Sequence, residues 1–169
     1  MVGVSDVTTA KTTRRAQYAQ RAGADAVMVL PVSYGKLSEH EILQHFLSIG
    51  DAIGIPIMMY NNPATSGVDM SPELLVRMFE TIDNVSMVKE STGDLSRMRR
   101  IDELSGGRLL FYNGSNPLVF NALQAGATGW CTAAPRLRPL RLHRLRESED
   151  RGRRGGGLEP GRAPERVVG

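Results

Sequence analysis

Short apolar runs alternate with helical patterns along the first 135 residues, and this alternation constrains the fold more than any other feature. The runs are continuously apolar, which is typical of strands buried on both faces of a parallel sheet. A helix after each strand would cover that sheet. Six buried strands are expected, at Met1–Val4, Ala26–Leu30, Ile55–Tyr60, Val85–Val88, Leu109–Tyr112 and Gly129–Thr132.

The segments between these strands carry helix signals. Thr8 or Thr9 can cap the first helix. Ser38 and Glu41 have the spacing of a capping box for the second, whose apolar positions continue at helical spacing as far as Ile53. Three further helices are predicted, one capped by Ser71, one over Leu95–Leu104, and one over Pro117–Ala125 with the apolar residues Leu118, Phe120 and Leu123.

No glycine-rich phosphate loop of the Rossmann or Walker type opens any of these helices, which disfavours a nucleotide-binding fold. A (β/α) barrel is favoured instead, although a closed barrel has eight strands. We therefore expect an α/β fold over residues 1–135, a partial (β/α)8 TIM barrel. It would have about six parallel strand–helix units and lack the first two strands.

The composition changes at Arg136. Residues 136–169 are rich in Arg, Gly and Pro, carry the chain's net positive charge, and are expected to be a disordered tail. One hypothesis is that this tail is the out-of-frame translation of a GC-rich gene. The alternative, an RNA-binding arm, is disfavoured because no aromatic residues are interleaved with the arginines.

Cysteine content and hydropathy bear on location. Cys131 is the only cysteine, so an internal disulfide is excluded and a reducing compartment is favoured. The sequence has no apolar span long enough for a membrane helix and no secretory leader at Met1. We expect a cytoplasmic protein without a membrane partner.

Lys89 and Tyr60 are the strongest candidates for chemistry, because each lies at the end of an apolar strand and the two strands are neighbours. Functional groups gather at the carboxyl ends of parallel strands, which lie about 5 Å apart. An uncharged amine can attack a ketone to form a Schiff base, and a nearby phenol can relay the protons. The alternative is a lysine that extends into water beside a core tyrosine.

Three segments resemble those of the dihydrodipicolinate synthase and N-acetylneuraminate lyase superfamily. Tyr60–Gly67 (YNNPATSG) is similar to its Y-N-x-P-x-x-[ST]-G motif, and Val88–Asp94 (VKESTGD) is similar to its Schiff-base segment. Pro31–Ser38 resembles the tyrosine-containing loop after the fourth strand of its barrel. The resemblance implies a (β/α)8 barrel and a class I pyruvate-dependent aldolase or condensing enzyme, usually a homotetramer.

The resemblance also implies roles for individual residues. Lys89 would attack C2 of pyruvate, and Tyr60 would be the general acid and base. Tyr34 would cross a dimer interface to complete the proton relay. Gly114 and Cys131 would line the pyruvate pocket with backbone. The second substrate would be an aldehyde, and neither a metal nor another cofactor would be required, because the protonated imine accepts the electrons.

The sequence also departs from the family pattern. Thr65 lies at the substrate site where the synthases have an arginine that binds the carboxylate of the aldehyde substrate. Asn116 and Pro117 replace an Asp–Glu pair of the sialic-acid lyases. The family's pyruvate-binding G-T-T-G-E loop would lie before Met1. We expect a 2-keto-acid lyase or aldolase with an unassigned aldehyde. Two alternatives are an inactive family member and the 4-hydroxy-tetrahydrodipicolinate synthase of lysine biosynthesis.

Overall fold

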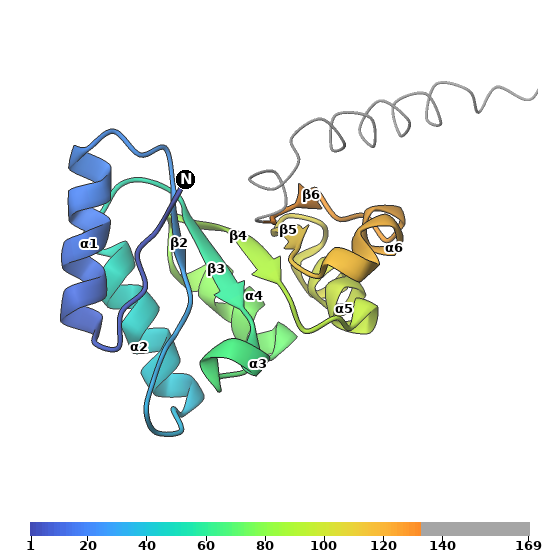
Figure 1. The fold of residues 1–169 in the computed structure, drawn as a ribbon, viewed down its shortest axis with the longest axis horizontal. Coiled ribbons are helices and arrows are strands. Elements are labelled where there is room, and N and C mark those ends of the chain that lie inside the picture. The colour runs from blue at the N-terminus through green and yellow to red at the C-terminus, as the bar shows by residue number, and fades with distance from the viewer. Residues whose placement is uncertain (133–169) are drawn as a thin grey trace, which may run out of the picture. The chain divides into compact units, whose positions relative to one another are not determined.

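A computed structural model describes residues 1–132. The predictions for the tail at 136–169 lie outside these residues. Six strands form one parallel sheet whose spatial order is the order along the chain (Figure 1). They are β1 Val2–Gly3, β2 Val27–Val29, β3 Ile57–Asn61, β4 Val85–Glu90, β5 Leu110–Asn113 and β6 Gly129–Trp130.

Helices connect the strands. They are α1 Thr9–Arg21, α2 Glu39–Gly50, α3 Pro63–Ser66, α4 Pro72–Thr81, α5 Leu95–Ser105 and α6 Val119–Gln124, with a 3₁₀ turn, η1, at Asn116–Leu118. Parallel neighbours joined by helical crossovers are the repeating unit of a (β/α)8 barrel. The prediction of a partial barrel with six parallel strands is confirmed.

Side-chain hydrogen bonds begin the main helices where the sequence predicts them. Thr8 is the N-cap of α1, and Ser71 Oγ accepts from Leu74 N at 3.1 Å to cap α4. Ser38 and Glu41 form the predicted capping box of α2. Each cap satisfies a backbone N–H that has no partner within its helix, which fixes where the helix begins.

The core lies between the helices and one face of the sheet. Val29, Met59, Val88 and Phe111 occupy one cross-strand row, and all four are buried. They share a single apolar cluster with residues of α1, α2, α4 and α5. Because side chains alternate between the faces of a strand, the next row points to the opposite face. In a closed barrel that face lines the interior.

Several local predictions are wrong. Val2 and Gly3 in β1 are exposed, because β1 is an edge strand and only Val4 of the expected buried run is covered. Phe120 is 60% exposed and does not face the core. The helix predicted at Pro117–Ala125 divides into η1 and α6, and α2 ends before Ile53.

The short helix α3 was not predicted.

No helix within residues 1–132 combines the length and the apolar character needed to cross a membrane.

Candidate active site

Lys89 and Tyr60 lie side by side at the carboxyl ends of β4 and β3. They are partners in the parallel register, and Tyr112 of β5 is the next residue in the same row. Lys89 Nζ lies 4.0 Å from the centroid of the Tyr60 ring. A lysine amine is attracted to the face of an aromatic ring, so this contact favours a position of the amine beside the phenol.

The hydroxyl of Tyr60 accepts a hydrogen bond from the residue that directly follows β3. Asn62 Nδ2 donates a hydrogen bond to Tyr60 Oη at 2.9 Å. Because this bond occupies an acceptor position of the phenol, its O–H remains able to donate to a second group. Tyr60 therefore combines a fixed orientation with a transferable proton.

Gly114 packs against the stem of Lys89. A Cβ at this position would overlap Ser91 Oγ and would lie 2.9 Å from Lys89 Cε. Gly114 N also donates to Glu90 O at 2.7 Å, which joins the end of β5 to the end of β4. Glycine permits this approach without displacing either side chain, so Gly114 contributes to the shape of the space around the amine.

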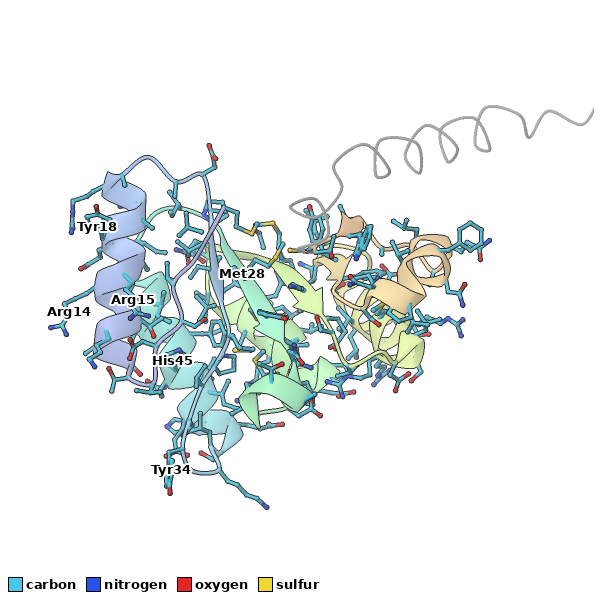
Figure 2. The ribbon with its side chains drawn as sticks, viewed as in Figure 1. Arg14, Arg15, Tyr18, Met28, Tyr34 and His45 are labelled. Carbon is cyan, nitrogen blue, oxygen red and sulfur yellow. The ribbon has the colours of Figure 1, made fainter. Side chains whose placement is uncertain are left out.

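The structure does not bring the other candidate residues into contact with Lys89. Thr65 is exposed on α3. Cys131 is a free, half-buried cysteine whose backbone N–H donates to Asn113 O at 3.0 Å. Tyr34 is fully exposed on the loop before α2, and Figure 2 shows its ring pointing away from the helices. Their roles stay predictions.

Sequence reasoning missed a row of buried polar residues directly behind the candidate site. Asn61, Glu90 and Asn113 are in register on β3, β4 and β5, and all three are completely buried. Asn61 Nδ2 donates to Glu90 Oε2 at 3.1 Å. Their polarity at the ends of apolar strands was the available signal, because a buried polar group needs a specific partner.

Two hollows in the described part of the chain lie away from these residues. One of about 420 Å³ lies between the start of α1 and α2, and one of about 650 Å³ lies along β1 and α1. Neither is lined by Lys89 or Tyr60, so the candidate site is identified by its reactive groups. Within residues 1–132 no three His, Cys, Asp or Glu side chains gather as metal ligands would.

A family model described as the dihydrodipicolinate synthetase family matches residues 1–155. The chain belongs to this family. Its curated relatives include a 4-hydroxy-tetrahydrodipicolinate synthase of Clostridium perfringens, 34% identical over 131 residues. That alignment covers 78% of this chain and 45% of the relative. This member of the dihydrodipicolinate synthetase family thus spans about half the length of the curated relatives it matches.

Solved structures of the dihydrodipicolinate synthetase family share the fold. One, described as a dihydrodipicolinate synthetase from Pseudomonas aeruginosa, is 60% identical with a TM-score of 0.78, over 79% of this chain and 47% of that one. YagE, a prophage protein of the family from E. coli K12 solved in complex with pyruvate, is 26% identical with a TM-score of 0.80. That match covers 92% of this chain and 54% of YagE.

Proposed function

We propose that this chain belongs to a lyase or aldolase that binds a 2-keto acid, of which pyruvate is the simplest, as a Schiff base on Lys89. The observation that carries the proposal is the position of Lys89 Nζ over the Tyr60 ring. An amine and a phenol lie together at the carboxyl ends of adjacent strands, which supports their proposed roles as nucleophile and proton carrier. Family membership and the pyruvate complex of YagE support the same chemistry.

The reaction follows from these two groups. Lys89 Nζ attacks the carbonyl carbon C2, and the carbonyl oxygen takes a proton to give a carbinolamine. Loss of water then gives the protonated imine, with Tyr60 Oη delivering and recovering protons. The imine nitrogen accepts electrons when a C3 proton leaves, which yields an enamine. In the condensing direction the enamine carbon forms a bond to an aldehyde, and in the reverse direction that bond breaks.

The remaining candidates have supporting roles in this proposal. The backbone at Gly114 and Cys131 borders the keto acid, and Thr65 faces the second substrate, an aldehyde. Tyr34 completes the proton relay in a homo-oligomer, since its fully exposed ring is available to a second copy. The identity of the aldehyde separates a synthase of the C. perfringens kind from other family activities.

Reductive trapping tests the proposal. The full chain is incubated with pyruvate and borohydride, digested, and searched by mass spectrometry for one reduced pyruvate on Lys89. Lys36→Ala is a matched control, because Lys36 is exposed on a loop and the chain has only one other lysine besides these two, Lys11. We expect the adduct in the wild type and in Lys36→Ala, and none in Lys89→Ala. A folded wild type without an adduct at Lys89 would support the alternative of an inactive family member.

A further inference from the structure

Asn61 and Glu90 directly follow Tyr60 and Lys89 on β3 and β4, and the two residues are partners in the register. Both are completely buried, and they point to the opposite face of the sheet from the candidate site. The hydrogen bond from Asn61 Nδ2 to Glu90 Oε2 is therefore a cross-strand link one residue beyond the site.

The carboxylate of Glu90 is held on both oxygens. Thr92 N donates to Oε1 at 2.8 Å, and Arg97 Nε lies 3.5 Å from Oε2, where Asn61 also donates. A buried charge costs several kcal/mol unless such partners compensate it. The strand ends are therefore confined to the arrangement that keeps all of these partners in place.

The same network reaches the segment that follows α3. Arg97 Nη2 donates to Asp69 Oδ1 at 2.9 Å and to Met70 O at 2.6 Å. Asn61 Oδ1 accepts from Met70 N at 3.0 Å. Glu90 is thus connected, through Asn61 and Arg97, to Asp69 and Met70 in the segment that follows α3.

We propose that Glu90 is a positioning residue, whose buried carboxylate acts through Asn61 to hold Lys89 Nζ over the Tyr60 ring. Neighbouring residues on a strand share one backbone, so a twist or slip that released Glu90 would also move Lys89. Misplacement of a reacting group by about 1 Å can cost about a hundredfold in rate. The catalytic consequence rests on the proposed function, whereas the geometric claim does not.

If Glu90 only stabilised the fold, replacing it would affect the position of Lys89 no more than another destabilising substitution in the same strands. Asn84 provides the comparison, since it lies at the opposite ends of the same strands. Its Nδ2 donates to Gly50 O, Ile53 O and Ile55 O, and its backbone carbonyl accepts from Ile57 N. Asn84→Ala should destabilise β3 and β4 without releasing Lys89, because it leaves the carboxyl ends intact.

Nuclear magnetic resonance of the lysine ε-methylene groups in the full chain tests the geometric claim. The chain has three lysines, and the ring current of Tyr60 should move only the Lys89 signal upfield. Lys89→Arg assigns that signal by its loss. Glu90→Gln keeps the shape of the side chain but removes its charge and one acceptor oxygen. We expect it to move the Lys89 signal to the position of the two exposed lysines, and Asn84→Ala to leave it in place.

An unchanged Lys89 signal in folded Glu90→Gln would overturn the inference. The absence of an upfield Lys89 signal in the wild type would also overturn it. So would a change of that signal in Asn84→Ala equal to the change in Glu90→Gln. If Glu90→Gln does not fold, Asn61→Ala removes the same cross-strand link and should give the same change in signal.

Trapping with pyruvate then separates the two proposals. Glu90→Gln should lower the maximal rate of adduct formation by about a hundredfold while the half-saturating pyruvate concentration changes little. An upfield Lys89 signal without any adduct would refute the proposed function and leave the positioning role standing.

Discussion

Gly114→Ala should displace the amine of Lys89. The new Cβ would lie 2.9 Å from both Lys89 Cε and Ser91 Cβ, and it would overlap Ser91 Oγ. Carbon atoms prefer separations of about 3.5–4.0 Å, so the lysine stem must move by about 1 Å. Overpacking of this kind costs about 1–3 kcal/mol of stability. A displacement of about 1 Å is also enough to slow Schiff-base formation about a hundredfold.

The assay is the rate of borohydride-trapped adduct at Lys89, measured beside the urea unfolding midpoint. Gly3→Ala is the control, because a Cβ at Gly3 would meet no atom within 4 Å. Adding Ser91→Gly to Gly114→Ala removes the overlap with Ser91 and should restore stability, but the contact with Lys89 Cε remains and the rate should stay low. A Gly114→Ala protein that forms the adduct at the wild-type rate would refute the reasoning.

Three further outcomes are expected. Tyr60→Phe keeps the ring under Lys89 but removes the hydroxyl, so adduct formation should slow by about a hundredfold or more while the Lys89 upfield signal persists. Ser38→Ala removes the cap of α2, which should lower the free energy of unfolding by about 1 kcal/mol in urea titrations. Burial lowers the pKa of His45 below its ordinary value of 6.5. The unfolded chain therefore binds this proton more tightly, and stability should fall as the pH drops through about 6.5, less so in His45→Gln.

The periodicity of apolar residues was sufficient to predict the six strands and the longer helices, because burial on both faces leaves few alternatives for runs such as Ile55–Tyr60. Boundaries at the sheet edge were less predictable. Val2 and Phe120 are apolar but exposed, since nothing within residues 1–132 covers them. An apolar residue shows that burial is favourable, not that a partner is present.

Lys89 and Tyr60 could be predicted as neighbours because they end adjacent strands. Their supports could not, since Glu90 and Asn61 form a pair only when register and side-chain direction are both known. A one-residue shift would have exchanged the two rows and placed the carboxylate, not the amine, on the inner face. Ser91 and Gly114 illustrate the same limit, because their close approach depends on the path of two loops after different strands.

The candidate site lies on the two central strands of the sheet, and this position explains how the geometry of its side chains is maintained. β3 and β4 have five and six residues and are each paired on both sides, whereas β1 and β6 have two residues each and are paired on one side in the described part of the chain. Strand ends bonded on both sides open less readily than edge strands. The amine, the phenol and the buried pair behind them all lie on β3 and β4. Their geometry is therefore supported by local contacts, and fraying of β1 or β6 would leave Lys89 over Tyr60.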